Sequence, residues 1–253
     1  MPKTDAKRVT LSFDNGPHPE VTPIVLDILR MHDIRTTFFV VGQRVIEHRD
    51  TARRARDEGH WIGNHTWSHS RPFREKGDIA FVSSEIDRTQ DAIGDLTHPD
   101  KLFRPFGGGG RLDGALNPVA AGHLQQRGFT CVLWNSVPGD FRDAIGWPET
   151  ALDQMAQSDW PLVVLHDVHA EAMTRLDRFI STVKDLGYSF RQELPESTIA
   201  IRRGQPTPVL HDGVLAGGDF IQSTERTASN GPDCSDRRRW HRQGSRARGY
   251  PRA

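Results

Sequence analysis

Short apolar segments of β-type residues alternate with helical segments along most of the chain, and this alternation restricts the possible folds more than any other feature. Several of the apolar segments are apolar throughout, as strands covered on both faces are. The expected strands are 8–13, 36–41, 60–64, 101–104, 130–135, 161–166 and 198–202. About seven strands that alternate with about six helices form parallel βαβ units. We therefore expect an α/β fold, built as a closed or nearly closed βα barrel.

The expected helices show the helical period with different clarity. Segment 20–32 carries apolar residues at the i, i+3, i+4 and i+7 spacing of an amphipathic helix. Segment 44–58 is strongly charged and is expected to face solvent. The remaining expected helices are 79–94, 118–127, 148–159 and 171–187.

Composition excludes several classes of protein. The 253 residues include 33 basic and 33 acidic side chains, and this balance argues against a nucleic-acid-binding or membrane-surface protein. The two cysteines, Cys131 and Cys234, form no disulfide framework, so we expect them to be reduced. No apolar run approaches the roughly 18 residues of a transmembrane helix, and residues 1–8 show no apolar signal-peptide core. We expect a cytoplasmic protein without a membrane span.

The composition changes after residue 204. Segment 205–253 has no sustained period and is rich in Gly, Ser, Pro and Thr, and 237–253 holds seven arginines and no acidic residue. We expect one folded domain over 1–204, followed by a disordered basic tail over 205–253 to which no chemistry is assigned.

Asp14 and Asn15 directly follow the expected strand 8–13 and precede a Gly-Pro turn. Taken alone, such a pair is most often an Asx-type turn. In α/β proteins, however, the carboxyl ends of the strands also form the ligand-binding edge. The pair becomes a candidate site if other strand ends supply partners for it.

The strongest local signal is the pair His65 and His69, which follows strand 60–64. Two imidazoles four residues apart lie on one side of a helical turn, so both can reach one metal ion. The alternative is a pair of surface histidines. Their place beyond a strand end favours a metal site, with Zn²⁺ as the default for imidazole and oxygen ligands. Asn15 or Asp14 is the candidate third ligand.

Three further strand ends carry polar residues. Arg104, which precedes a run of glycines, either pairs with Asp14 and keeps that carboxylate ionised or lies exposed in a loop. Asp140 follows the fifth expected strand and is otherwise explained as a turn residue. His166 ends the sixth expected strand, where a core histidine is the ordinary interpretation. A carboxylate beside His166 would raise its pKa and suit it to general-acid catalysis.

Together and in this order, these segments resemble the motifs of NodB-type polysaccharide deacetylases, carbohydrate esterase family 4, over about residues 8–203. Segment 12–17, Ser-Phe-Asp-Asn-Gly-Pro, is similar to the family's Thr-Phe-Asp-Asp-Gly-Pro motif, and segment 65–69 matches His-Ser/Thr-x-x-His. The other matches are 104–107 with Arg-x-Pro-aromatic-Gly, 134–141 with the Asp-Trp motif and 165–166 with the closing Leu-x-His region. The resemblance implies a distorted (β/α)₇ barrel.

The resemblance also implies an activity. The chain would be a metal-dependent hydrolase that removes the N-acetyl group from an amino sugar, an oligosaccharide or a polysaccharide, and releases acetate. His65, His69 and Asn15 would hold a divalent metal ion, expected to be Zn²⁺. Asp14 would be the general base toward the attacking water.

The same resemblance assigns supporting and substrate-binding roles. Arg104 would hold Asp14, and Asp140 would orient His166, the general acid that protonates the departing amine. A backbone N–H near Phe106 would face the oxyanion, and Leu165 would line the pocket for the acetyl methyl group. The implied substrate-binding residues are Phe106, Gly107, Trp134 and Leu165.

Position 15 departs from the commonest family pattern, which has Asp there. A neutral amide oxygen is expected to bind a metal ion more weakly than a carboxylate. Family members that act on muramic acid resemble this chain in carrying Asn at this position. The third motif is also one residue shorter than usual, and Phe141 replaces a Trp in an apolar wall.

Two alternative functions follow from the same residues. The chain is also similar to relatives that deformylate amino sugars or hydrolyse cyclic ureides and imides such as allantoin. A non-catalytic carbohydrate-binding barrel that has lost its metal is the alternative from a different class. The acyl group, the sugar and the oligomeric state have no signal in the sequence.

Overall fold

Strand β1 (Lys7–Asp14) has three parallel partners in the computed structural model, which describes residues 7–107 and 115–210. These partners are β2 (Thr37–Val40), β6 (Leu162–His166) and β7 (Tyr188–Arg191). The register places Asp14 beside Phe39 of β2 and beside His166 of β6. The end of β1 is thus flanked by two other strand ends.

Beyond β2 the sheet continues in parallel through β3 (Trp61–Asn64), β4 (Leu102–Phe103) and β5 (Thr130–Val132). Two antiparallel strands follow, β8 (Ile199–Arg202) beside β5 and β9 (Gln205–Pro206) beside β8. The resulting order is β6-β1-β2-β3-β4-β5-β8-β9, with β7 beside β1.

The ring of parallel strands is closed between β5 and β6 by an irregular junction. Past the end of β5, Ser136 forms an isolated parallel bridge with Val163 of β6. The side chain of Asn135 adds two hydrogen bonds, accepting from Leu162 N at 2.7 Å and donating to Trp160 O at 3.1 Å. The fold is therefore a distorted βα barrel, which confirms the expected fold class.

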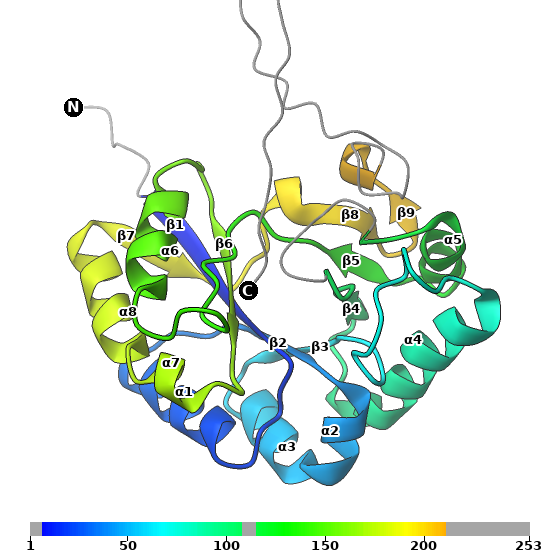
Figure 1. Cartoon of the computed structure of the whole chain (residues 1–253), viewed down its shortest axis with the longest axis horizontal. Coiled ribbons are helices and arrows are strands. Elements are labelled where there is room, and N and C mark those ends of the chain that lie inside the picture. The colour runs from blue at the N-terminus through cyan, green and yellow to red at the C-terminus, as the bar shows by residue number, and fades with distance from the viewer. Residues whose placement is uncertain (1–6, 108–114, 211–253) are drawn as a thin grey trace, which may run out of the picture. The chain divides into compact units, whose positions relative to one another are not determined.

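Helices surround the strands on the outside (Figure 1). They are α1 (Val21–Met31), α2 (Gly42–Glu47), α3 (Arg49–Asp57), α4 (Ile79–Ile93), α5 (Pro118–Gln126), α6 (Trp147–Met155), α7 (Ala170–Met173) and α8 (Leu176–Asp185). Short 3₁₀ turns occur at η1 (Gly94–Leu96), η2 (Glu196–Thr198) and η3 (Pro208–Leu210). Within the described ranges, no helix has the length and apolar character needed to cross a bilayer.

The side chains of β1 point to two layers of the fold, one on each face of the strand. Val9, Leu11 and Phe13 are buried in the layer between the sheet and the outer helices. The alternate residues face the inside of the barrel, because successive side chains of a strand point to opposite faces. Five apolar side chains from five strands pack together inside the barrel: Phe39, Leu102, Val132, Leu162 and Ile199. This layer forms an apolar floor beneath the ends of the strands.

Two expected helices are each divided in the structure. The backbone of His48 leaves the helical conformation, with φ −131° and ψ 43°, and separates α2 from α3 within the expected helix 44–58. The bend allows both Val45 and Ala52 to be buried, although the charged sequence carries no breaker there. The expected helix 171–187 is likewise divided into α7 and α8.

The end of the fold also differs from expectation. The expected seventh strand, 198–202, is β8, and it runs antiparallel to β5 because no crossover helix separates it from β7. Strand β7 was not expected, since its side chains are only half-buried or exposed and lack an apolar run. Strand β9 and η3 extend the fold past the expected boundary at 204, and the rest of the expected tail, 211–253, lies outside the described residues.

Candidate active site

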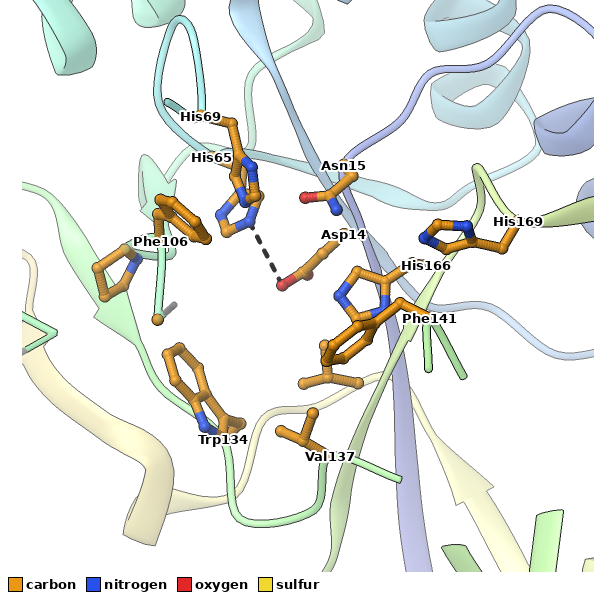
Figure 2. A pocket seen from close by; sticks show the side chains of 13 residues that line it. Asp14, Asn15, His65, His69, Phe106, Trp134, Val137, Phe141, His166 and His169 are labelled. Atoms are coloured by element: carbon orange, nitrogen blue, oxygen red, sulfur yellow. Dashed lines mark ion pairs between the residues drawn. The ribbon is translucent and has the colours of Figure 1, made fainter. Parts of the chain in front are cut away.

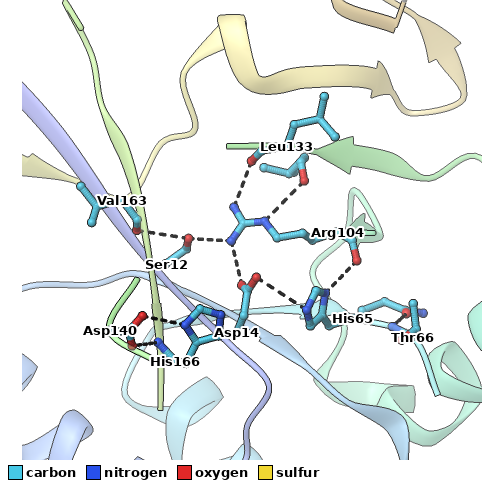
Figure 3. Close-up of polar contacts among 11 residues, drawn as sticks. Ser12, Asp14, His65, Thr66, Arg104, Leu133, Asp140, Val163 and His166 are labelled. Carbon is cyan, nitrogen blue, oxygen red and sulfur yellow. Dashed lines mark hydrogen bonds and ion pairs between the residues drawn. The ribbon is translucent and has the colours of Figure 1, made fainter. Parts of the chain in front are cut away.

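Asp14 forms an ion pair with Arg104 inside the barrel (Figure 3). Nη1 of Arg104 lies 2.8 Å from Asp14 Oδ1 and 2.7 Å from Ser12 Oγ. The remaining guanidinium nitrogens donate to the carbonyl oxygens of Val132 and Leu133, at 3.4 and 3.2 Å. Arg104 has no exposed surface and Asp14 is only 4% exposed. Four hydrogen bonds hold the guanidinium in one orientation, so the guanidinium in turn fixes the carboxylate.

The charges around Asp14 keep it ionised. Burial alone would raise its pKa, but the guanidinium of Arg104, together with the imidazole of His166, holds it below the ordinary value of 3.8. Burial lowers the pKa of Arg104, yet a guanidinium stays protonated in proteins. Asp14 is therefore available to accept a proton at neutral pH.

The pairing of β3 with β4 brings His65 to this carboxylate. Asn64 and Phe103 are register partners, so the residues that follow them, His65 and Arg104, are neighbours. Nδ1 of His65 lies 2.9 Å from the carbonyl oxygen of Arg104 and therefore carries the proton that it donates. Nε2 is left unprotonated, 3.6 Å from Asp14 Oδ2. A neutral imidazole held in this way is the form that binds a metal ion.

The loop after β3 is held by a buried carboxylate on α4. Glu85, only 5% exposed, accepts hydrogen bonds from the Ser68 backbone N–H at 2.9 Å and from the Ser68 hydroxyl at 2.8 Å. The loop contains two residues with positive φ, Thr66 at 69° and His69 at 50°, a conformation that L-residues rarely adopt. Glu85 thus stabilises the turn that presents His69, although nothing in the sequence marked it.

His65, His69 and Asn15 lie together on one side of the cavity (Figure 2). The two imidazole centroids are 4.8 Å apart, and burial lowers the pKa of His69 to about 3, so the ring is neutral. Asn15 has φ 77°, and its Oδ1 is buried without a hydrogen-bond partner among the described residues. Two imidazole nitrogens and one orphaned amide oxygen are donors that suit a divalent metal ion.

A metal ion held at this place would depend on the amide of Asn15. Within residues 7–107 and 115–210, no three His, Cys, Asp or Glu side chains are arranged to hold a metal ion. If a metal ion binds to the two histidines, the oxygen of Asn15 would be the candidate third protein ligand.

His166 is oriented by Asp140 (Figure 3). Its Nδ1 lies 2.8 Å from Asp140 Oδ1, and its backbone N–H donates to Asp140 Oδ2 at 2.8 Å. Burial works against the charge of His166, but Asp140, followed by Asp14, raises its pKa above 6.5. The carboxylate occupies Nδ1, so Nε2 is the nitrogen that remains to serve the cavity.

One cavity of about 290 Å³ collects most of the predicted site residues. Those that line it are Asp14, Asn15, His65, His69, Phe106, Gly107, Trp134 and His166. Arg104 and Asp140 do not line the cavity themselves. Arg104 contacts Asp14, and Asp140 contacts His166. Further lining residues are Pro105, Val137, Phe141, Val164 and His169. Of these, only Phe141 was predicted to contribute, as part of an apolar wall.

Leu165 is the exception, and its predicted place in the substrate pocket is wrong. Its side chain is fully buried in the layer between the sheet and the outer helices. Val164 and His166, on either side of it in β6, line the cavity instead. Because a strand alternates its side chains, the apolar residue that faces the cavity together with His166 is Val164, two places before it, and not the adjacent Leu165.

Asp167 supports the turn after β1 from behind. A Cβ atom at Gly16 would collide with the Asp167 carboxylate, so only glycine fits there. Thr22 donates a hydrogen bond to Asp167 Oδ2, and burial raises the pKa of this carboxyl to about 6. The turn that carries Asn15 is therefore packed against the residue that follows His166.

The chain is similar in sequence to known deacetylases. A family model described as polysaccharide deacetylase matches residues 2–123. The chitooligosaccharide deacetylase of Rhizobium leguminosarum bv. trifolii is 31% identical over 170 residues, which cover 65% of this chain and 73% of the relative.

Two peptidoglycan deacetylases are similar over a comparable stretch. The peptidoglycan-N-acetylglucosamine deacetylase PgdA of Listeria monocytogenes is 32% identical over 186 residues, 73% of this chain and 37% of the relative. The peptidoglycan-N-acetylmuramic acid deacetylase PdaC of Bacillus subtilis is 30% identical over 186 residues, 72% of this chain and 37% of the relative. The chain thus spans little more than a third of the length of these two relatives.

A solved structure of the peptidoglycan deacetylase PdaC from Bacillus subtilis matches the fold with a TM-score of 0.60 and 30% identity. The match covers 74% of this chain and 87% of that structure.

Proposed function

Because this chain belongs to the polysaccharide deacetylase family, we propose that it removes N-acetyl groups from an amino-sugar oligomer or polymer by metal-dependent hydrolysis. One observation carries the proposal. An ionised carboxylate, Asp14, and an imidazole with a raised pKa, His166, end neighbouring strands and share one cavity. Base and acid on two sides of a bound amide are what hydrolysis of that amide requires.

His65, His69 and Asn15 would hold the divalent ion, for which we propose Zn²⁺ because two imidazoles and one amide oxygen suit it. When bound, the ion would polarise the acyl oxygen and lower the pKa of the attacking water. Enzymes of this family are metal-dependent. The protein's own contribution is to keep both imidazoles neutral and to leave the Asn15 oxygen without another partner.

Asp14 begins the reaction by taking the proton of the water that attacks the acyl carbon. Its Oδ1 is occupied by Arg104, so Oδ2, which lies toward His65, is the oxygen left to accept this proton. Arg104 stays in place as the proton arrives, because three further hydrogen bonds, to Ser12, Val132 and Leu133, fix it. Little reorganisation is then needed at the base.

His166 completes the reaction by donating a proton to the sugar nitrogen as the carbon–nitrogen bond breaks. Asp140 keeps the donor protonated and directed at the cavity. The products are acetate and a free amino group on the sugar. A backbone N–H near Phe106 would stabilise the oxyanion formed in between.

Four apolar side chains form the wall beside His166: Trp134, Val137, Phe141 and Val164. An acetyl methyl group fits such a wall, while the sugar ring lies toward the open side. The matched relatives are named for N-acetylated sugars, which favours an acetamide over a formyl or cyclic amide substrate. The joint presence of base, arginine, aspartate and acid favours catalysis over carbohydrate binding alone.

A cytoplasmic location stays a prediction. Fractionation of cells that produce the protein, followed by immunoblotting, would test it. Recovery in the culture medium or the cell wall would contradict it.

The function is tested by acetate release from N-acetylchitooligosaccharides and from peptidoglycan, using protein loaded with Zn²⁺. Asp14→Ala should lower the rate by roughly 10²–10⁴-fold, because the base is lost. Asp185→Ala, at the exposed end of α8, is the control and should keep the wild-type rate. Equal acetate release by wild type and Asp14→Ala would refute the proposal.

A further inference from the structure

A second cavity, polar in character, adjoins the first. It measures about 280 Å³ and shares two residues with the first cavity, Asn15 and His69. Its other lining residues come from α2, from the residue before it and from the loop after β3: Val41, Gln43, Arg44, Glu47 and Ser68. If the acyl group of a substrate lies in the first cavity, other substituents of the same sugar would therefore reach the second cavity.

Arg44 is the unsatisfied charge in this second cavity. It is half-buried, yet its guanidinium makes no hydrogen bond or ion pair with another of the described residues. Even Glu47, one turn further along α2, does not come within the 4.0 Å of an ion pair with it. A half-buried guanidinium whose donors are all free is suited to an incoming anion.

The charge of Arg44 also acts on a residue of the first cavity. His169, which lines the first cavity beside His166, has a pKa lowered first by burial and then by the charges of His166 and Arg44. Arg44 is therefore close enough to the first cavity for its field to act there. An anionic group between the two cavities would meet this charge.

Glu47 is the opposing charge, and it lies further out. Its side chain is 66% exposed, and its nearest partner is His48 Nε2 at 3.9 Å. Water screens such a carboxylate well, whereas the half-buried Arg44 is screened less. The part of the cavity near Arg44 thus favours a negatively charged group. Glu47, at the exposed part, weakens this preference.

We propose that this second cavity binds a carboxylate carried by the sugar that is deacetylated, with Arg44 as its ion-pair partner. The proposal rests on the deacetylase function and narrows its substrate class to acidic amino sugars. A carboxylate offers two oxygens that match the fork of a guanidinium, so the interaction is directional as well as attractive.

The test compares two forms of one substrate. A tetrasaccharide of alternating N-acetylglucosamine and N-acetylmuramic acid carries lactyl carboxylates, and conversion of these to methyl esters removes the charge with little change in shape. For the wild type, kcat/KM should be about tenfold to a hundredfold higher for the acid than for the ester, as expected for a charge-assisted hydrogen-bonded pair. The difference should lie mainly in KM.

Variants at the two charges should move this ratio in opposite directions. Arg44→Ala should bring the ratio of acid to ester near one, and Arg44→Lys should retain part of it. Glu47→Gln should raise the ratio. Arg178→Ala, which removes an exposed arginine of α8, should keep the wild-type ratio. A wild-type ratio near one, or an Arg44→Ala variant with the wild-type ratio, would overturn the proposal.

Binding measured by calorimetry separates this proposal from the function on which it rests. Wild type that releases no acetate from any substrate would refute the deacetylase function. Calorimetry of the acid and ester forms with wild type and Arg44→Ala still decides whether the cavity binds a carboxylate. Equal affinity for both forms in the wild type would refute the anion site, whatever the rate of acetate release.

Discussion

The base and the acid of the site lie on strands, whereas the metal ligands lie on turns. Asp14 and His166 are register partners on β1 and β6, so the hydrogen bonds of the sheet set their separation. Asn15 and His69 have positive φ, and side chains from outside the sheet hold their turns. The backbone pairing of the barrel therefore fixes the positions of Asp14 and His166. The positions of Asn15 and His69 depend instead on side-chain contacts with α4 and Asp167.

This difference separates two kinds of consequence. A change on the strand side is expected to alter both the stability of the barrel and the rate of the chemical step. A change on the turn side is expected to alter metal affinity first. Four substitutions test this division.

The largest effect is expected at Arg104. Arg104→Ala leaves Asp14 buried without its counterion, and the loss of one partner of a buried pair costs about 3–5 kcal/mol of unfolding free energy. The pKa of Asp14 should then rise, since burial raises it and Arg104 is the main group that lowers it. Urea unfolding measures the first effect, and the acid limb of kcat/KM, shifted to higher pH, measures the second. Arg178→Ala, as control, should stay within about 0.5 kcal/mol of wild type.

Asp140→Asn is the second test of the strand side. Burial, no longer opposed by this carboxylate, should lower the pKa of His166. The protonated acid then disappears at lower pH, so the alkaline limb of kcat/KM should move downward, with a loss of about a hundredfold at neutral pH. The ion pair also stabilises the fold only while His166 is protonated. In the wild type this stabilisation is lost as pH rises through the raised pKa, and in Asp140→Asn that dependence should be absent.

Glu85→Gln tests the turn side. Replacing the carboxylate that accepts both hydrogen bonds from Ser68 should loosen the presentation of His69. Residues that orient metal ligands typically affect metal affinity by about 10–100-fold. Competition with a chelator of known affinity measures this loss, while urea unfolding of the metal-free protein reports any general weakening. Glu149→Gln, exposed on α6, is the control. An unchanged metal affinity would place the stability of the turn elsewhere.

Asn15→Asp should produce the smallest effect, and it should raise the metal affinity rather than lower it. A carboxylate adds a negative charge where the amide now supplies a neutral oxygen, so Zn²⁺ should bind about tenfold more tightly. The same chelator competition measures it, with Asn15→Ala as the variant that should bind more weakly. If Asn15→Asp and wild type bind Zn²⁺ equally, the side chain at position 15 is not a ligand.

The strand side was also the part that the sequence predicted best. Asp14 and His166 could be placed at the same edge because each directly follows an apolar run, and parallel strands end at one edge. Arg104 could be paired with Asp14 because the resemblance named both. Each of these predictions needs only the order of the strands and the chemistry of the side chain.

The turn side and the walls needed information that no local pattern carries. Glu85 lies on a helix more than a dozen residues from the loop that it holds. The sequence around it does not distinguish it from an exposed acidic residue on the helix surface. Leu165 was placed in the pocket because the motif names a leucine before the histidine, but the phase of β6 decides which of two adjacent apolar residues faces inward. The antiparallel β8 follows from a connection without a helix, which periodicity alone did not show.

The junction between β5 and β6 has a consequence for substrate range. Ser136 and Asn135 are the residues that join the two strands, and Trp134 and Val137, on either side of them, line the cavity. The wall proposed to face the acyl group thus lies at the junction of β5 and β6. There, side-chain hydrogen bonds replace part of the regular backbone hydrogen bonding between strands. The size of the acyl chain that the cavity admits is therefore set by a few replaceable contacts, and evolution could widen it without rebuilding the strands that carry the base and the acid.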